Sequence, residues 1–389
     1  MRQLDQTAAG RLDRLLSAAP DPVGVAVSGG SDSLAMLSLA HDWARRNGRR
    51  LLVLTVDHGL RSEARQETDH VATVADRHGL DHRILKWGRP VAVQARARQA
   101  RHGLLAAALR EAGGAALLTG HTLDDQRETF LIRARQGSGW YGLGGLDAVA
   151  PSPSWPRGRG VTLVRPLLGE RRRDLREHLL RAGLGWCEDR SNDDPRFERV
   201  RVRHLLAQAP QLSGRVDRVQ ARLARLRRAR QRHLAKLAES RVTAQGDATV
   251  RVEDHGLDGE VRRQLVASLV QIAAGTDRPP RGPRLDALLE AFPPGETAPG
   301  RTLGGAWIWR VPDALYLARD PGAGAEVRME DDVWDGRFLR DGDAPELSAS
   351  TEVMGRRSTQ PPDPGTGWRS LLSDRLAHQV ACWRGTPFG

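Results

Sequence analysis

Cysteines and long apolar runs are the scarcest features of this 389-residue sequence. Its two cysteines, Cys187 and Cys382, form no Cys-x-x-Cys motif. This scarcity argues against a disulfide-stabilised scaffold, a cysteine-rich zinc site and sulfur chemistry that uses paired cysteines. No stretch approaches the roughly 20 apolar residues of a membrane helix, and the first 20 residues have no apolar signal-peptide core. We therefore expect a cytoplasmic protein of two or three globular domains, with no membrane partner.

Lysine is also nearly absent, because Lys86 and Lys236 are the only two among 60 basic residues. A Walker A loop is thereby excluded, since it requires a Gly-Lys-Ser/Thr sequence. Most of the net charge of +12 comes from residues 199–240, which carry 12 basic and 2 acidic residues. A GC-rich genome would explain the preference for arginine, whereas a localised basic block indicates a polyanionic partner.

Strand-like and helix-like patterns alternate through the first half of the chain. Short apolar runs at 23–27, 51–56, 82–87 and 115–119 are typical of buried strands. Helical patterns follow each of them. The first has apolar residues at positions 34, 37, 40 and 44 and a stop at Gly48, and the others cover 62–78, 91–111 and 122–135. This order predicts an α/β fold with a doubly wound, Rossmann-like parallel sheet. Ligands of such sheets bind at the carboxyl ends of the strands.

The rest of the chain divides by composition. Residues 136–160 are rich in Gly, Ser and Pro, which predicts a mobile loop, and a strand at 161–166 and a helix at 170–182 close the first domain. We expect a catalytic domain over 1–212, a basic linker helix over 213–240 and a smaller α+β domain over 241–325. The extension over 326–389 is expected to be partly irregular, since 344–367 is rich in Pro, Ser, Thr and Gly.

The strongest chemical signal is the loop that follows the first predicted strand. It reads Ser28, Gly29, Gly30, Ser31, Asp32 and Ser33. The glycines let the backbone approach an anion, and the next helix offers free N–H groups at its positive end. The serines add hydroxyl donors, and the carboxylate of Asp32 can hold Mg²⁺. An ordinary Gly/Ser turn is the competing interpretation, but the loop resembles the ATP-binding loop of the N-type ATP pyrophosphatases, which grips the pyrophosphate of ATP.

A second polar segment, residues 120–128, follows the fourth predicted strand and contains His121, Asp125 and Glu128. Asp125 and Glu128 are three residues apart, so they share one face of a helix. Two carboxylates at a strand-end pocket could bind Mg²⁺ or hold a cationic substrate. Acidic pairs on helices are more often solvated, but this pair is expected at the same sheet edge as the Ser28 loop.

Three weaker segments complete the pattern. Asp57 and His58 follow the second strand, where a simple turn is the alternative. Arg98 and Arg101 share a helix face and could contact phosphates, although a solvated face is as good an interpretation. An Asp-rich turn over 188–194 leads into closely spaced arginines at positions 199, 201 and 203.

Together, in this order, the five segments resemble the tRNA(Ile)-lysidine synthetase family across roughly residues 23–206. The family pattern is SGGxDS, VDHGLR, an AR-x-x-R helix, GHxxDDQxET and a D-x-SN segment before the arginines. This chain departs from it at Arg127, where a small residue is usual, at His102, where tyrosine is common, and at Val200, where asparagine is common. Arg127 lies next to both carboxylates in sequence and could alter their charge balance.

The resemblance implies a ligase that joins free L-lysine to the wobble cytidine of an isoleucine tRNA with a CAU anticodon. ATP activates the cytosine C2 oxygen by adenylation, with Mg²⁺ near Asp32, and pyrophosphate and AMP leave. By this resemblance the catalytic residues are Asp32, Arg101, His121, Asp125 and Glu128. The ATP-binding residues are Ser28, Gly29, Gly30, Ser31, Asp32, Ser33, Asp57 and His58. The residues that bind lysine or tRNA are Arg98, Arg101, Asp125, Glu128, Asn192, Arg199 and Arg203, and the 241–325 domain also binds tRNA.

Other functions remain open from the residues alone. Another tRNA-modifying or adenylating enzyme with this ATP-binding loop is one alternative, although two isolated cysteines argue against a thiolase. A second alternative is a non-catalytic RNA-binding relative. For the oligomeric state we consider a homodimer.

Overall fold

The computed structural model describes residues 3–57, 63–87, 94–188, 194–245, 248–320, 329–330, 332–334, 337–340 and 368–388. The chain forms two compact units. Unit 1 comprises residues 1–152, 160–231 and 385–389, and unit 2 comprises residues 153–159 and 232–384. Among the helices of the described residues, none is long and apolar enough to cross a membrane.

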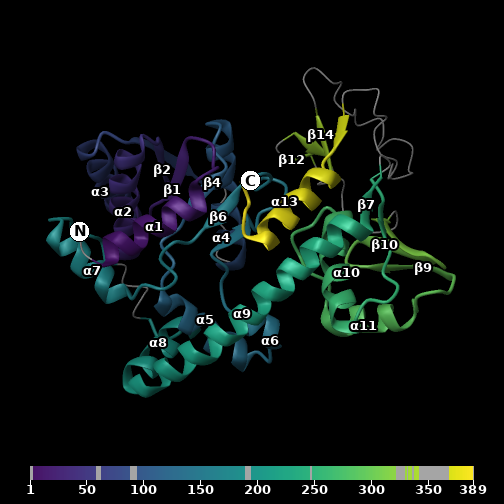
Figure 1. Ribbon diagram of the computed structural model, residues 1–389. Coiled ribbons are helices and arrows are strands. Elements are labelled where there is room, and N and C mark those ends of the chain that lie inside the picture. The colour runs from purple at the N-terminus through teal and green to yellow at the C-terminus, as the bar shows by residue number, and fades with distance from the viewer. Residues whose placement is uncertain are drawn as a thin grey trace. The chain divides into compact units, whose positions relative to one another are not determined.

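Unit 1 is built on a six-stranded sheet with the order β3-β2-β1-β4-β6-β5. Figure 1 labels its strands β2, β1, β4 and β6. Its strands are β1 (Val23–Ala26), β2 (Leu51–Asp57), β3 (Asp81–Lys86), β4 (Ala116–Leu118), β5 (Val149–Pro151) and β6 (Thr162–Val164). Its helices are α1 (Gln3–Leu16), α2 (Ser31–Asn47), α3 (Glu63–Arg77), α4 (Gln94–Glu111), α5 (Leu123–Arg135), α6 (Trp140–Leu143), α7 (Arg172–Arg181) and α8 (Glu198–Gln208). Every strand pair is parallel except the β5–β6 edge pair. The strand order reverses between β1 and β4, which confirms the predicted doubly wound sheet.

Both faces of this sheet are buried, as its apolar strands require. Alternate residues of β2 enter two different cores: Leu51 and Val53 pack on the side of α1, α2, α3 and α7, and Leu52 and Leu54 pack on the side of α4. Neighbouring side chains of a strand point to opposite faces of the sheet. Because both faces are buried at β2, consecutive residues along the strand must be apolar, which explains its continuous apolar run. The carboxyl edge is left to the loops after the strands.

Helix α2 shows how the sequence sets the ends of these elements. Its apolar residues recur at helical spacing and are buried against the sheet. Gly48 ends the helix with φ 63°, in the left-handed region that glycine adopts without strain, and its N–H donates to the carbonyl of Ala44. The predicted stop at Gly48 is confirmed.

The mobile loop expected over residues 136–160 is wrong for part of that segment, because it contains α6 and the antiparallel strand β5. Arg133 of α5 donates to the carbonyl oxygens of Gly142 at 2.7 Å and Gly145 at 2.9 Å. These side-chain bonds satisfy two carbonyl oxygens of the Gly-rich segment.

Unit 2 holds a five-stranded antiparallel sheet with the order β7-β8-β11-β10-β9. Its strands are β7 (Val242–Ala244), β8 (Val250–Val252), β9 (Ala298–Leu303), β10 (Ala306–Val311) and β11 (Ala314–Arg319), and its helices are α10 (Gly259–Ala273), α11 (Gly282–Glu290) and α13 (Leu372–Arg384). A smaller sheet joins β12 (Met329–Glu330), β13 (Val333–Trp334), β14 (Phe338–Arg340) and β15 (Trp368–Ser370). Helix α13 packs Leu372, Val380 and Trp383 into the core of this unit. The smaller α+β part is therefore present, and the predicted irregular segment 344–367 lies outside the described residues.

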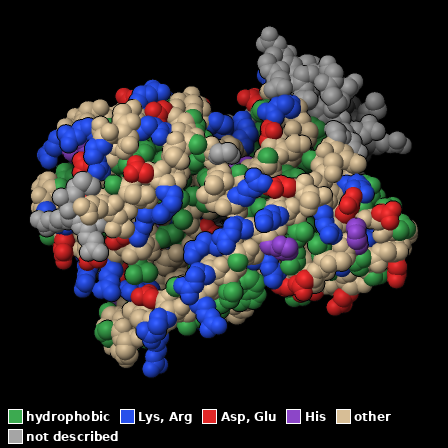
Figure 2. Space-filling view, in the orientation of Figure 1, with side chains coloured by type: hydrophobic (Ala, Val, Ile, Leu, Met, Phe, Trp, Pro, Cys, Tyr) green, Lys and Arg blue, Asp and Glu red, His purple; other side chains and the backbone are tan. Residues whose placement is uncertain are grey.

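One long helix, α9 (Pro210–Arg241), covers the range predicted for the basic linker. In unit 1, Arg227 on the buried side of α9 binds the helix to residues 145–147. It is 4% exposed and donates to Asp147 Oδ1 at 2.6 Å and to the Gly145 carbonyl at 2.7 Å. Gln220 donates to the Gln126 carbonyl at 3.0 Å. The exposed arginines of α9 are Arg215, Arg218, Arg222, Arg225, Arg228 and Arg232. Figure 2 shows basic side chains gathered along this helix. The predicted domain boundaries at 212, 240 and 325 stay a prediction.

Candidate active site

The loop between β1 and α2 has the geometry of an anion cradle. Gly29 has φ +83°, and the backbone N–H of Ser28 donates to Ser33 Oγ at 3.1 Å. Ser33 Oγ in turn donates to the Gly30 carbonyl at 3.0 Å, which holds the loop closed on itself. Gly30 is the N-cap of α2, and no side chain caps it. The first N–H groups of α2 therefore remain available to a phosphate.

The segment after β4 lies directly against this loop. A Cβ atom on Gly120 would be 2.5 Å from the Asp32 carbonyl oxygen, so only glycine allows the two strand ends to approach this closely. Thr122 then caps α5: its Oγ1 accepts from the Asp125 N–H at 3.4 Å, and its own N–H donates to Asp125 Oδ2 at 2.8 Å. The strand order places both loops at the switch point, where ligands of such sheets bind.

Asp125 uses one oxygen for this capping box and turns the other toward Arg172, 3.5 Å away. Burial alone would raise the pKa of Asp125, but Arg172, His121 and the Thr122 N–H together lower it. The carboxylate is therefore ionised, and only its Oδ1 side can meet a substrate without breaking the cap.

Glu128 is 1% exposed and lies among three arginines. Its Oε1 accepts from Arg203 Nε at 3.0 Å and is 3.6 Å from Arg172 Nη1, and its Oε2 is 3.8 Å from Arg199 Nε. The structure thus brings together Glu128, Arg199 and Arg203, which were predicted from segments about 70 residues apart. Oε2 makes no hydrogen bond within the described residues, so a donor from a ligand could satisfy it.

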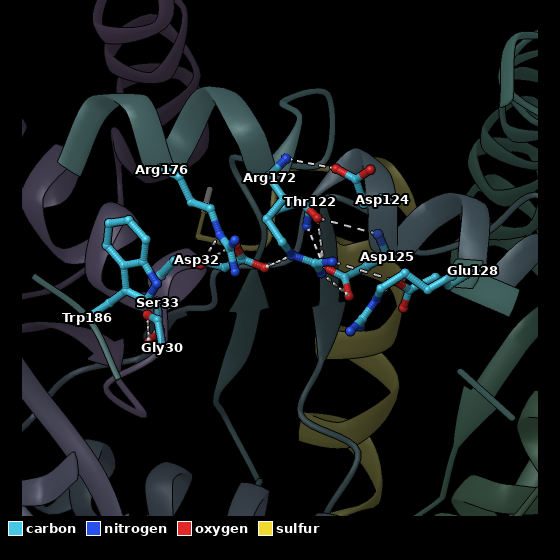
Figure 3. Close-up of polar contacts among 12 residues, drawn as sticks. Gly30, Asp32, Ser33, Thr122, Asp124, Asp125, Glu128, Arg172, Arg176 and Trp186 are labelled. Carbon is cyan, nitrogen blue, oxygen red and sulfur yellow. Dashed lines mark hydrogen bonds and ion pairs between the residues drawn. The ribbon is translucent and has the colours of Figure 1, made fainter. Parts of the chain in front are cut away.

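Arg172, the first residue of α7, is the central side chain of the site (Figure 3). Its Nε donates to Asp32 Oδ2 at 2.8 Å, and its two other nitrogens face Asp125 and Glu128. Burial would lower the pKa of this guanidinium, but the carboxylates raise it further above its usual value. Burial raises the pKa of Asp32 although Arg172 opposes the shift.

Sequence reasoning missed Arg172, although a signal was present. Three arginines, 171–173, stand at the start of the predicted helix, where the helix dipole disfavours positive charge. The backbone N–H of Arg172 donates to Asp124 Oδ2 at 2.7 Å, so a carboxylate of α5 stabilises this helix end. A positive charge at the N-terminus of a helix, where it is unfavourable, indicates a carboxylate partner on another element of the fold.

A second missed contact lies on the other side of the loop. The N–H of Cys187 donates to the Gly29 carbonyl at 2.9 Å, which holds segment 186–188 against the loop. Arg176 pairs with Glu188 at 3.0 Å and lies 5.5 Å from the ring centre of Trp186. The predicted residue Asn192, in the same Asp-rich turn, lies outside the described residues.

The predicted arginines of α4 form a cationic patch beside these carboxylates. Burial and the charge of Arg199 lower the pKa of Arg98, and burial and the charge of Arg98 lower that of Arg101. His121 Nδ1 is 2.9 Å from Thr119 Oγ1, and burial and Arg165 lower its pKa to about 3. His121 is therefore neutral, and the arginines form a patch suited to an anion.

Asp57 ends β2, the strand beside β1, and so lies at the same sheet edge as the loop. Its neighbour His58 lies outside the described residues. Among the described residues no cluster of three or more His, Cys, Asp or Glu side chains could hold a metal ion unaided. A metal at Asp32 would need oxygen ligands from a bound nucleotide.

Arg127 does not turn toward the two carboxylates whose charge it was expected to alter. Its guanidinium donates to both oxygens of Asp217 on α9, at 2.8 and 2.7 Å, and lies 3.5 Å from Asp124. Asp217 and Asp124 balance its charge, and the pair joins α5 to α9.

Comparisons with known proteins agree with this geometry. Residues 4–210 match the family model of the PP-loop domain. The chain is 48% identical over 303 residues to the tRNA(Ile)-lysidine synthase of Hyphomonas neptunium, covering 76% of this chain and 80% of that protein. It is 39% identical over 333 residues to the enzyme of that name from Methylobacterium nodulans, covering 80% and 94%. With the enzyme of Caulobacter vibrioides the identity is 34% over 350 residues, covering 86% and 78%. The chain, with its anion-binding loop and α5 carboxylates at one switch point, therefore belongs to the tRNA(Ile)-lysidine synthase family, within the PP-loop proteins.

Proposed function

We propose that this enzyme joins free lysine to C2 of the wobble cytidine in the CAU anticodon of isoleucine tRNA, with ATP converted to AMP and pyrophosphate. The observation that carries the proposal is the convergence of the PP loop and the α5 carboxylates on Arg172 in a chain of this family. One side of the site suits phosphates, and the other suits an ammonium group.

The first step is adenylation of the cytosine C2 oxygen. The PP loop and the free N–H groups of α2 hold the phosphates of ATP, and the C2 oxygen attacks the α-phosphorus while pyrophosphate leaves. Mg²⁺ fits this site, because it is usually held by one or two carboxylates together with substrate phosphates, and Asp32 is such a carboxylate. When bound, it would neutralise phosphate charge there.

The second step needs lysine as a neutral amine. A lysine ammonium has a pKa of about 10.4 in water and binds first as a cation. Asp125 Oδ1 and the unbonded Oε2 of Glu128 are the acceptors that could hold it. The positive charges of Arg98, Arg199 and Arg203 lower the proton affinity of an ammonium placed here. The free amine then attacks C2, and AMP leaves from the oxygen that it activated.

The proposed function also predicts the partners of the enzyme and its cellular location. tRNA supplies the polyanion that the arginines of α9 would contact, and free lysine is the second substrate. Since its substrates are found there, we place the enzyme in the cytoplasm. The homodimer stays a prediction.

Mass analysis of the anticodon loop tests this function. The chain is incubated with isoleucine tRNA bearing CAU, ATP, Mg²⁺ and lysine, and the loop fragment should gain the mass of lysine less water. Asp32→Ala should abolish AMP formation while tRNA binding persists. A loop that gains no lysine, with ATP still consumed, would favour another PP-loop activity, and tRNA binding without ATP use would favour a non-catalytic relative.

A further inference from the structure

Arg172 links two groups of carboxylates that serve different substrates in the proposed reaction. Asp32 belongs to the ATP-binding loop, and Asp125 and Glu128 belong to the helix that faces lysine. The Nε contact with Asp32 is a hydrogen bond of 2.8 Å, whereas the contacts with Asp125 and Glu128 are 3.5 and 3.6 Å, beyond hydrogen-bond length. The guanidinium is thus firmly held on the ATP side and loosely held on the lysine side.

The backbone around Arg172 is fixed to the same helix. Its N–H donates to Asp124 Oδ2 at 2.7 Å, and the N–H of Leu123 donates to the carbonyl of Glu170 at 2.8 Å. These two bonds run in opposite directions between the start of α5 and the start of α7. The side chain is 21% exposed, so a ligand can reach it.

We propose that Arg172 is a positioning residue that couples the ATP half of the site to the lysine half. Through Nε it orients Asp32 for adenylation. Its other two nitrogens lie near Asp125 Oδ1 and Glu128 Oε1, where its charge competes with a lysine ammonium, directly at Asp125 Oδ1 and through the shared carboxylate at Glu128. This inference rests on the proposed function and deepens it. Among the described residues, Arg172 is the side chain whose ion pairs connect Asp32 with the carboxylates of α5.

The coupling predicts opposite effects on the two substrates when the guanidinium is removed. Arg172→Gln should slow adenylation about 10- to 150-fold, the range for loss of one charge-assisted hydrogen bond. The same variant should lower the lysine concentration for half-maximal rate at least about two-fold, because Asp125 and Glu128 lose a competing cation. A residue that only stabilised the fold would worsen both quantities.

The test measures two rates on the full chain. AMP transfer from labelled ATP to tRNA is followed without lysine, and lysidine formation is then followed against lysine concentration. Arg172→Lys should restore part of the adenylation rate, since an ammonium can pair with Asp32 but cannot span three carboxylates. Arg173→Gln is the matched control: it removes the same charge from the next residue, whose side chain is 71% exposed, and should change neither quantity.

Two results would overturn the inference. One is an Arg172→Gln variant whose lysine requirement is unchanged or raised, and the other is an Arg172→Lys variant that adenylates no faster than Arg172→Gln. Wild-type enzyme run in parallel separates this failure from that of the proposed function. Lysidine made by the wild type with either result refutes the coupling alone, whereas a wild type that makes no lysidine refutes the function and the coupling with it.

Discussion

Removing exposed arginines from α9 should weaken tRNA binding in a salt-dependent way. The variant replaces Arg222, Arg225, Arg228 and Arg232 with serine, all four of which are exposed in the structure. Each arginine that neutralises a phosphate contributes about 0.7–0.9 to the slope of log affinity against log salt. Four contacts therefore account for a slope of about three.

This slope sets the size of the effect. Between 50 and 200 mM salt, a slope of three corresponds to a roughly 60-fold loss of affinity, which the quadruple variant should no longer show. Filter binding or fluorescence titration of isoleucine tRNA at four or five salt concentrations measures it. ATP binding should not change, because the PP loop lies at the start of α2 and the four substituted arginines lie on α9.

A control of equal charge keeps the test specific. Arg45, Arg46, Arg50 and Arg77 are also exposed, but they lie where α2 and α3 end, at the amino edge of the sheet, away from the site. Their replacement by serine changes net charge by the same amount and should leave the slope within about one unit of wild type. If the α9 variant kept the wild-type slope, or if both variants lost it equally, α9 would not be the tRNA surface.

Three further predictions concern stability and lysine binding. Arg127→Ala and Asp217→Ala should each lower the free energy of unfolding by about 1.5–3 kcal/mol, and the double variant should lose less than the sum, as chemical denaturation would show. Burial lowers the pKa of both His102 and His121 to about 3, with Arg98 adding to the shift at His102 and Arg165 at His121, so the unfolded chain binds these protons first as pH falls. The free energy of unfolding should therefore decrease as the pH falls below about 6.5. Replacing either histidine with Gln should reduce the slope of this free energy against pH by about 1.4 kcal/mol per pH unit, as measured in urea titrations at pH 4.5–6. Glu128→Gln should raise the lysine requirement about 10- to 150-fold in steady-state assays, and an unchanged requirement with ATP use lost would reassign the carboxylate to the nucleotide.

The parts of the fold that the sequence predicts well are those decided by neighbouring residues. Apolar runs that end in Gly or Asp mark β1, β2 and β4, and the glycine at position 48 marks the end of α2. Once the alternation of strands and helices predicts a doubly wound sheet, the rule on carboxyl edges brings the Ser28 and Gly120 loops together. Strand β5 was missed because it pairs at the sheet edge, within a segment whose Gly, Ser and Pro content conceals it.

The central contacts of the site were harder to foresee because they join residues that are distant in sequence. Arg172 is 140 residues from Asp32 and 47 from Asp125, and no spacing rule connects such positions. The capping box of α5 is hidden for a different reason: Thr122 and Asp125 show the pattern in sequence, but a carboxylate beside a predicted ligand site also suits ligand binding. One carboxylate oxygen of Asp125 caps the helix, and the other faces Arg172 in the site.

The pair formed by Arg127 and Asp217 explains two irregularities of the sequence at once. Arg127 stands where the family pattern has a small residue, and Asp217 is the one acidic residue between positions 199 and 236. Each is anomalous when considered in its own segment, but the two side chains meet in a bidentate ion pair at 2.8 and 2.7 Å. Because Asp217 is used on the inner side of α9, it does not offset the arginines exposed on that helix. The exposed face of α9 is then more strongly basic than the count of charges suggests, which strengthens the case that a polyanion binds there.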